Sequence, residues 1–240
     1  MIIGIYGFQD AGKTKLVEEV VRALARKGYS VSSVKHTPHR KSVDSEGKDT
    51  WRHWKAGSDP VAFSSECETT IIKHSKTPVE DICGMIDREF APDVIVVEGL
   101  KDGPFPKVAI GGVSKRKGTV LTNPTLKQLV EYVEIEVAVE RALAKLPGLD
   151  CGKCGLDCAR LARAIALKSR RLNDCKELSD TKVEVYVGGR RMPTGRFTSS
   201  VVHDTVRGLL GSMKGYEHGE KVEIRLEAKK AVAKPRRKAR

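Results

Sequence analysis

Apolar residues recur at strand and helix spacing through the first part of the chain, and their pattern predicts an α/β fold. Residues 2–6 are an apolar run of strand length, and residues 13–27 carry Leu and Val side chains at helical spacing. Gly28 follows as a helix C-cap, and residues 29–35 are expected to form a second strand. This strand–loop–helix–strand order predicts a mostly parallel sheet with right-handed crossovers and helices on both faces.

The same pattern continues to a boundary at Pro147 and Gly148. Before that boundary we expect a short helix at 50–56, strands at 61–64 and 69–73, a helix at 78–90, strands at 93–97, 107–110 and 119–121, and a helix, whole or broken, from Pro124 to about 146. Beyond it we expect a helix at 159–171, a strand at 183–187, a helix at 198–213 and a strand at 221–226. The predicted parts are a large α/β domain (1–147), a cysteine module (148–178), a small α+β unit (179–228) and a basic disordered tail (229–240).

The composition is that of a globular chain, with 40% hydrophobic and 31% charged residues. No apolar run has the length of a membrane span, and the first one ends in a glycine loop, so we expect a cytoplasmic protein without a membrane partner. The net charge of +13 could attract nucleic acid, but residues 229–240 contribute seven positive charges, no acid and no aromatic residue. The remainder carries only +6, so charge does not identify a nucleic-acid partner, and we do not expect one.

The segment after the first strand matches the phosphate-binding pattern G-x-x-x-x-G-K-[ST]. Its residues are Gly7, Phe8, Gln9, Asp10, Ala11, Gly12, Lys13 and Thr14. The glycines let backbone N–H groups turn toward an anion, and the helix that follows adds the positive end of its dipole. Lys13 can reach the β- and γ-phosphates, and the Thr14 hydroxyl can ligate Mg²⁺. The segment lies between a predicted strand and an amphipathic helix, so we expect a nucleoside triphosphate to bind there.

A magnesium site also needs a carboxylate at the end of a neighbouring strand. Glu98 directly follows the apolar run 94–97 and is the expected second ligand beside Thr14. A solvated acid at a strand end would fit the sequence as well.

The loop after the second strand carries Asp44 and Asp49, either of which could face a γ-phosphate or merely be solvated. The guanine-reading pattern Asn-Lys-x-Asp is absent, because Asn123 is followed by Pro124. The residues of the loop therefore indicate a triphosphate without choosing its base.

Four of the six cysteines lie within 25 residues, at Cys151, Cys154, Cys158 and Cys175. In a cytoplasmic chain such a cluster indicates a metal site rather than disulfides. Three clustered cysteines and a distant fourth favour a [4Fe–4S] cluster, whereas zinc ribbons use two paired C-x₂-C knuckles. Zn²⁺ and a site without metal remain the alternatives.

The phosphate loop and several later segments together resemble the MobB family of molybdopterin-guanine dinucleotide biosynthesis. The segments are Val34-Lys35-His36-Thr37-Pro38-His39, Asp44-Ser45-Glu46-Gly47-Lys48-Asp49-Thr50, Ala56-Gly57, Val97-Glu98-Gly99-Leu100-Lys101 and Pro106-Lys107. The resemblance covers roughly residues 1–145 and implies a P-loop, GTP-binding α/β protein. It also implies weak GTPase activity, a homodimer, and assistance to the guanylyltransferase that acts on molybdopterin.

On that resemblance Lys13 and Glu98 are the catalytic residues, and Glu98 acts at the metal. The residues that would surround the nucleotide or the pterin phosphate are Lys35, His36, Asp44, Lys48, Asp49 and Lys101.

The cysteine segment resembles the small [4Fe–4S] domains of corrinoid iron–sulfur proteins and electron-transfer complexes, which begin with C-G-x-C-G. Here that stretch runs from Cys151 to Gly155, but the next gap is three residues rather than four. We therefore expect a GTP-binding accessory protein of molybdenum or tungsten cofactor synthesis that carries a cluster. The alternatives are a redox-sensing or electron-transfer adaptor with regulatory nucleotide binding, and a nucleic-acid-binding P-loop protein.

Overall fold

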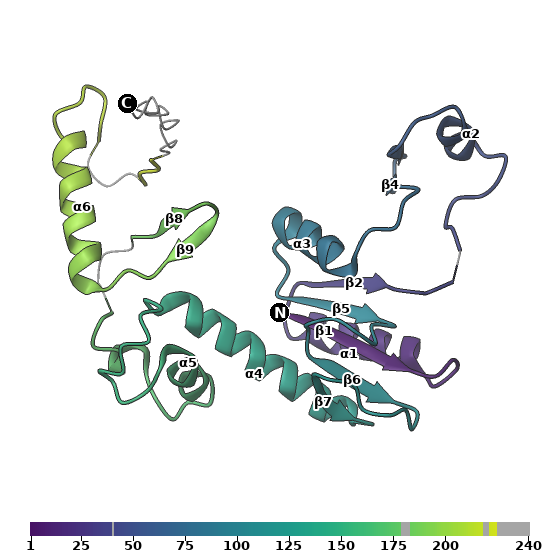
Figure 1. Cartoon of the computed structure of the whole chain (residues 1–240), viewed down its shortest axis with the longest axis horizontal. Helices are drawn as coiled ribbons and strands as arrows, with labels where there is room; N and C mark the ends of the chain where they lie inside the picture. Colours follow the sequence, from purple (N-terminus) through teal and green to yellow (C-terminus); the bar gives the residue numbers. More distant parts are fainter. Residues whose placement is uncertain (40, 179–182, 218–220, 225–240) are drawn as a thin grey trace, which may run out of the picture. The chain divides into compact units, whose positions relative to one another are not determined.

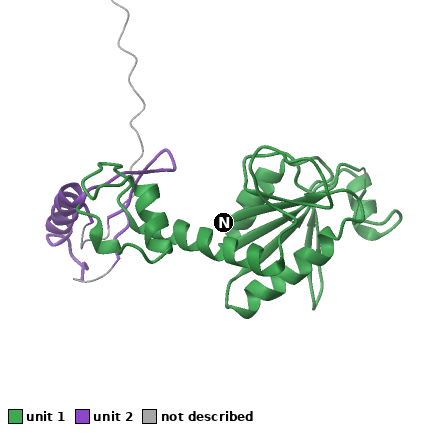
Figure 2. Ribbon diagram, turned by 90° about the horizontal axis from the view of Figure 1, so that it is seen from below, with its two compact units in different colours: residues 1–176 green, residues 177–240 purple. Residues whose placement is uncertain are grey.

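The computed structural model describes residues 1–39, 41–178, 183–217 and 221–224 (Figure 1). The chain forms two compact units, Met1–Lys176 and Glu177–Arg240 (Figure 2). The cysteine segment belongs to the first unit, together with the phosphate loop.

A five-stranded, fully parallel sheet is the centre of the first unit, with strand order β2-β5-β1-β6-β7. Its strands are β1 (Ile2–Gly7), β2 (Val31–Lys35), β5 (Val94–Glu98), β6 (Lys107–Ile110) and β7 (Thr119–Thr122). β2 lies two places from β1, β5 then inserts between these two strands, and β6 and β7 add on the opposite side of β1. A crevice therefore opens at the carboxyl end of β1, where open parallel sheets bind their ligands.

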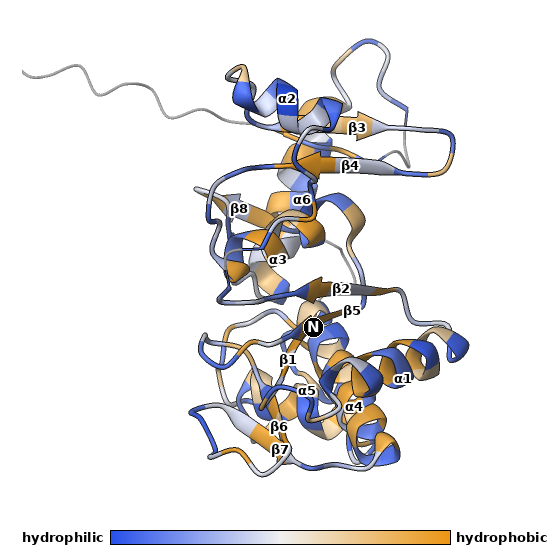
Figure 3. Cartoon of the chain, turned by 90° about the vertical axis from the view of Figure 1, so that its right-hand side faces the viewer, coloured by the Kyte–Doolittle hydropathy of each residue, from blue (hydrophilic) through white to orange (hydrophobic). Residues whose placement is uncertain are grey.

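Helices cover both faces of this sheet, which confirms the predicted fold class. On one face Val94 and Val96 of β5 pack against α1 (Lys13–Arg26) and α4 (Leu126–Lys145). On the other face Ile95 and Val97 pack against α3 (Val79–Phe90). Because β5 is buried on both faces, its residues 94–97 are continuously apolar rather than alternating. Figure 3 shows the apolar stripes of α1 and α4 beside their polar surfaces.

Residues between β2 and α3 form a separate lobe with α2 (Asp49–Lys55) and the antiparallel hairpin β3 (Val61–Ser64) and β4 (Thr69–Ile72). The Trp54 ring stacks on the His74 ring with centroids 4.1 Å apart. Asp44 joins them: its Oδ2 lies 3.5 Å from His74 Nε2, and its Oδ1 accepts a hydrogen bond from the Thr50 hydroxyl at 2.7 Å. The short helix and the hairpin lie where the pattern predicted them.

The helix expected from Pro124 to about 146 is unbroken. It begins with a capping box between Thr125 and Gln128. At its far end α5 (Cys158–Ala166) packs on it, and Arg163 makes two hydrogen bonds to the Glu136 carboxylate, at 2.7 and 3.0 Å. The prediction of a helix to residue 171 was wrong, because the chain turns at Lys168, whose φ is +59°. A short 3₁₀ turn, η1 (Leu172–Asp174), follows.

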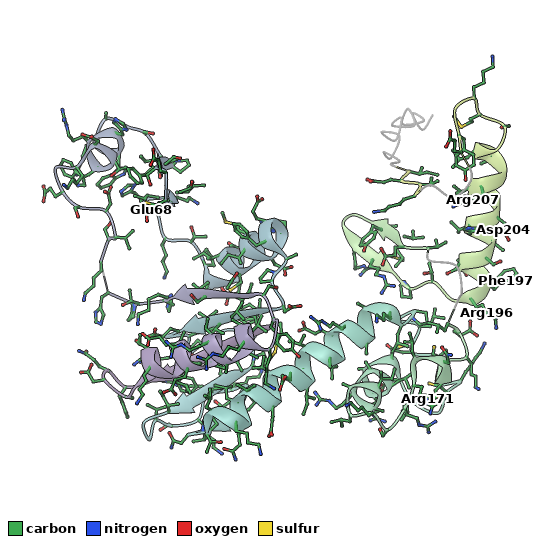
Figure 4. The ribbon with its side chains drawn as sticks, turned by 180° about the vertical axis from the view of Figure 1, so that it is seen from behind. Glu68, Arg171, Arg196, Phe197, Asp204 and Arg207 are labelled. Atoms are coloured by element: carbon green, nitrogen blue, oxygen red, sulfur yellow. The ribbon has the colours of Figure 1, made fainter. Side chains whose placement is uncertain are left out.

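The second unit contains the hairpin β8 (Val185–Val187) and β9 (Arg190–Met192), and then α6 (Arg196–Leu210). Figure 4 labels four side chains of α6, of which Phe197 is 79% exposed. The strand expected at 221–226 is wrong over 221–224, which have no regular structure, and 225–226 lie outside the described residues, as does the basic tail. Within the described ranges, no helix is long and apolar enough to span a bilayer.

Candidate nucleotide-binding site

The loop between β1 and α1 has the backbone shape that its glycines predict. Gly12, the residue before α1, has φ of +82°, and Asp10 has φ of +59°. Gly7 lies so close to β6 that a Cβ atom would be 2.6 Å from the Ile110 carbonyl oxygen. The loop therefore needs glycine at Gly7 for close packing and at Gly12 for its conformation.

Positive charge and backbone donors meet in this loop. The Lys13 ammonium donates to the carbonyl oxygens of Gly7, at 3.3 Å, and of Phe8. The first turn of α1 contains no acid that would offset the positive end of the helix dipole. The arrangement suits a polyanion such as a di- or triphosphate.

Glu98 ends β5 beside the loop and is 6% exposed. Its Oε1 accepts a hydrogen bond from the Thr14 hydroxyl at 2.9 Å and a second from the Lys35 ammonium. The hydroxyl and the carboxylate are the hard oxygen donors that Mg²⁺ prefers, so this pair fits a magnesium ion bound with a nucleotide. Sequence reasoning alone left open whether Glu98 is a solvated acid; the structure places it in the site.

The turn after Glu98 is held by close backbone contact. Gly99 has φ of +89°, and a Cβ atom there would collide with the His36 carbonyl oxygen. The His36 N–H donates to the Glu98 carbonyl oxygen at 2.8 Å. The ends of β2 and β5 are thereby kept together, which holds Lys35 and Glu98 side by side.

These elements enclose a cleft of about 380 Å³. Its lining residues are Gln9, Asp10, Gly12, Lys13, Thr14, Lys15, Lys35 and Glu98. All but Lys15 are among the residues predicted from the sequence, and Gly7 and Ala11 belong to the same loop. Lys15 was missed, although its place in the first turn of the helix after the loop could have indicated it.

Other predicted residues lie away from the cleft lining. Asp44 belongs to the Trp54–His74 cluster of the lobe, and Lys48 and Asp49 lie at the start of α2. Lys101 is exposed in the loop after β5. The structure thus brings together the loop, Lys35 and Glu98, and leaves the remaining predicted contacts outside the cleft.

Asn123 has a structural task instead of reading a base. Its side-chain oxygen accepts a hydrogen bond from the Gly111 N–H at 3.0 Å. Gly111 has φ of +73°, and a Cβ atom there would lie 2.5 Å from Ala11 Cβ. Asn123 therefore fixes the turn after β6, against which the phosphate loop packs.

Cys151 and Cys154 precede α5, Cys158 is its first residue and Cys175 follows η1; none of the four forms a disulfide. Cys158 and Cys175 are each buried, whereas Cys151 is exposed. Within the described residues no three His, Cys, Asp or Glu side chains form a group that could hold a metal ion, so the thiols are not gathered around one point. Their number and chemistry nevertheless fit an iron–sulfur cluster, for which four thiolates are the usual ligands.

The backbone of this segment is folded tightly. Gly152 and Gly155 both have positive φ, and the Gly155 N–H donates to the Gly152 carbonyl oxygen at 2.8 Å. The Cys158 N–H donates to Asp150 Oδ1 at 2.9 Å, which anchors the turn to α5. Gly152 and Gly155 are therefore turn residues of the cysteine segment.

Two parts of the chain match family models. Residues 2–133 match MobB, "Molybdopterin guanine dinucleotide synthesis protein B", and residues 146–177 match FeS, "Putative Fe-S cluster". The first match covers more than half of the chain and the whole phosphate site; the second includes all four clustered cysteines.

Individual relatives agree with these matches. A Methanocaldococcus jannaschii protein named "Putative molybdopterin-guanine dinucleotide biosynthesis adapter protein" is 24% identical over 239 residues, covering 95% of this chain and 98% of the relative. The Haemophilus influenzae molybdopterin-guanine dinucleotide biosynthesis adapter protein is 35% identical over 111 residues, which cover 45% of this chain and 62% of that protein. The crystal structure of Bacillus subtilis MobB aligns with 55% of this chain and 96% of its own, at 21% identity and a TM-score of 0.44.

Proposed function

The chain belongs to the MobB family, and from that premise we propose that it is a GTP-binding adapter in the synthesis of molybdopterin guanine dinucleotide. The observation that carries the proposal is the Thr14 hydroxyl on the buried Glu98 carboxylate, directly beside the glycine loop. A magnesium–triphosphate complex requires hard oxygen ligands for the metal beside a loop whose backbone N–H groups can face the phosphates. The names of the relatives support the pathway, and the family supports guanine as the base.

Each residue of the cleft has a separate task in this proposal. The N–H groups of the loop and the Lys13 ammonium bind the β- and γ-phosphates. Thr14 and Glu98 hold Mg²⁺, which supplies charge neutralisation to the phosphate oxygens when it is bound. Asp10 and Glu98 are the carboxylates that line the described cleft, and Glu98 is assigned here to the metal, so any hydrolysis would rest mainly on positioning and charge and would be slow.

We further propose that Cys151, Cys154, Cys158 and Cys175 hold a [4Fe–4S] cluster. The match of residues 146–177 to an iron–sulfur family and the tight turn at Gly152 and Gly155 support this assignment. Such a cluster would supply one-electron chemistry or structural order to the module. The thiol of each cysteine would have to turn toward a common centre to hold it.

Nucleotide titration tests the first proposal. Calorimetry with GTP and with ATP, each with and without Mg²⁺, should give tighter binding of GTP and a requirement for the metal. The same titration of Lys13→Met should lose the signal while the variant keeps its thermal midpoint. Equal affinity for GTP and ATP would contradict the guanine assignment, and no binding of either would contradict the nucleotide site.

A second assay tests the pathway. The chain should raise the rate at which a molybdopterin guanylyltransferase forms the dinucleotide, and it should bind that transferase or molybdopterin as a homodimer. The adapter role is wrong if the chain binds nucleotide but leaves the transferase rate unchanged and binds neither the transferase nor molybdopterin. An iron–sulfur electron-transfer role would then be the reading to test.

Anaerobic purification tests the cluster. Iron and sulfide in a ratio of about four each per chain would support [4Fe–4S], whereas about one Zn²⁺ per chain would support a zinc site.

A further inference from the structure

Two side chains, a hydroxyl and an ammonium, share one carboxylate oxygen atom in the cleft. Glu98 Oε1 accepts the hydrogen bonds of both the Thr14 hydroxyl and the Lys35 ammonium. In the proposed site this oxygen faces Mg²⁺, since Thr14 is the other protein ligand. The ammonium and the metal ion therefore need the same position.

The contact between Lys35 and Glu98 follows from the backbone and not only from one side-chain rotamer. β2 and β5 are parallel neighbours, and Lys35 and Glu98 are partners in their register. Side chains of such a pair project from the same face of the sheet and lie within a few ångströms of each other. The close contact of Gly99 with the His36 carbonyl holds this register at the strand ends.

Lys35 can leave its partner at little cost, whereas Glu98 cannot. The Lys35 side chain is 62% exposed and the Glu98 side chain is 7% exposed. An exposed ammonium on a flexible four-carbon stem keeps its hydration in other rotamers. The buried carboxylate, by contrast, needs a positive partner at all times.

The Lys35 ammonium can also reach a second anionic partner in the cleft. It lines the same cleft as Lys13 and the phosphate loop, so its ammonium can turn from Glu98 toward a bound phosphate. If a divalent ion and a triphosphate enter together, Lys35 exchanges one anionic partner, the Glu98 carboxylate, for another, a phosphate.

We propose that Lys35 is an internal counter-ion that holds the Glu98 carboxylate, is displaced from it by Mg²⁺, and then pairs with the nucleotide phosphate. The device makes the metal bind weakly by itself and strongly with the triphosphate, because only the phosphate gives the displaced lysine a new partner. By linkage, the metal increases nucleotide affinity by the same factor. This inference rests on the proposed magnesium–nucleotide site and assigns Lys35 as a positioning residue within it.

Manganese binding without nucleotide, measured by electron paramagnetic resonance, tests the competition directly. Lys35→Met should increase Mn²⁺ affinity about tenfold, since a neighbouring opposite charge changes the energetics of a carboxylate by about one to three pKa units. Lys15→Met is the matched control: Lys15 lines the same cleft and, among the described residues, takes part in no salt bridge. It removes the same charge without the contact to Glu98, so its effect should stay below about threefold.

The comparison has outcomes that separate this inference from the site itself. A large increase in Lys35→Met alone supports the proposal, even if the wild type binds Mn²⁺ too weakly to measure. Equal effects of the two variants, or no Mn²⁺ binding to any of them, overturn it. Failure of GTP to bind would contradict the proposed function, while the manganese comparison would still report on the Lys35–Glu98 pair.

A measurement on the wild-type chain avoids dependence on the folding of a variant. Amine acetylation followed by mass spectrometry reports how readily each lysine reacts, with Lys15 as the internal reference. Saturating Mn²⁺ should increase the acetylation rate of Lys35 relative to Lys15 as the metal displaces it, and added triphosphate should decrease it again. An unchanged ratio on metal saturation would overturn the displacement step.

Discussion

Two glycines of this chain have nearly the same backbone conformation, but only one lies in the phosphate loop. Gly12 has φ of +82° and Gly28 has φ of +85°, and a Cβ atom at either would meet no other atom within 4 Å. Gly28 ends α1, where its N–H donates to the Ala25 carbonyl at 3.0 Å. Alanine at either position therefore imposes backbone strain without a steric clash.

The strain predicts equal losses of stability. An L-residue in the left-handed region costs roughly 1–2 kcal/mol, and nothing near either glycine adds to it. Gly12→Ala and Gly28→Ala should each lower the free energy of unfolding by that amount. Urea unfolding, followed by the tryptophan fluorescence of the first unit and by circular dichroism, measures this loss.

Their effects on binding should differ. Alanine at Gly12 favours negative φ, which turns loop N–H groups away from the phosphates. Loss of one hydrogen bond to a charged group is worth about 1.5 kcal/mol, so nucleotide affinity should fall about tenfold or more. Gly28→Ala should bind a fluorescent triphosphate analogue as the wild type does.

Comparing Gly12→Ala with Gly28→Ala is informative because both variants are expected to lose the same free energy of unfolding. If Gly12→Ala loses stability but binds the analogue unchanged, the loop does not hold the phosphates. If both variants lose affinity equally, binding depends on general stability, and the argument from loop geometry is refuted.

Three further predictions concern other contacts. Glu98→Gln keeps the shape of the side chain but removes its charge, so Mg²⁺ dependence of nucleotide binding should weaken about tenfold or more in calorimetry, while metal-free affinity should not fall, because Lys35 is then released to pair with a phosphate; an unchanged metal dependence would exclude Glu98 as a ligand. The Ser30 N–H and the Arg141 guanidinium hold the pKa of Asp93 below its usual value, so Asp93 stabilises the fold above the unfolded pKa of about 3.9 and this stabilisation is lost as pH falls through the lower folded pKa. Asp93→Asn should accordingly lower the urea midpoint at pH 7, and the gap to wild type should close in acid; a gap independent of pH would contradict the electrostatic cause. Cys158→Ser removes a buried thiol from the proposed cluster and should reduce bound iron to less than about half after anaerobic purification, with nucleotide affinity unchanged; full iron content would exclude this ligand.

The nucleotide loop shows what can be predicted locally. A buried strand, eight residues of fixed pattern and an amphipathic helix are adjacent in the chain, so short-range rules of periodicity and backbone conformation suffice to place them. The same holds for the hairpin of the lobe, whose two strands are separated by a short turn in the chain. The end of α5 was misjudged because helix-forming residue types continue past Lys168, where the backbone enters the left-handed region and the next N–H groups bond back to the Ala164 carbonyl oxygen.

The sequence by itself therefore determined the fold class, the phosphate loop and the presence of four candidate thiolate ligands. Only the tertiary structure decided which distant side chains meet that loop. Lys35 and Glu98 are 63 positions apart, and their pairing depends on the register of β2 and β5, which no local pattern encodes. Asp44 shows the converse: it has the residue type and position of a site residue, yet long-range packing directs it to His74 and away from the cleft, because burial of a carboxylate is decided by all the segments around it.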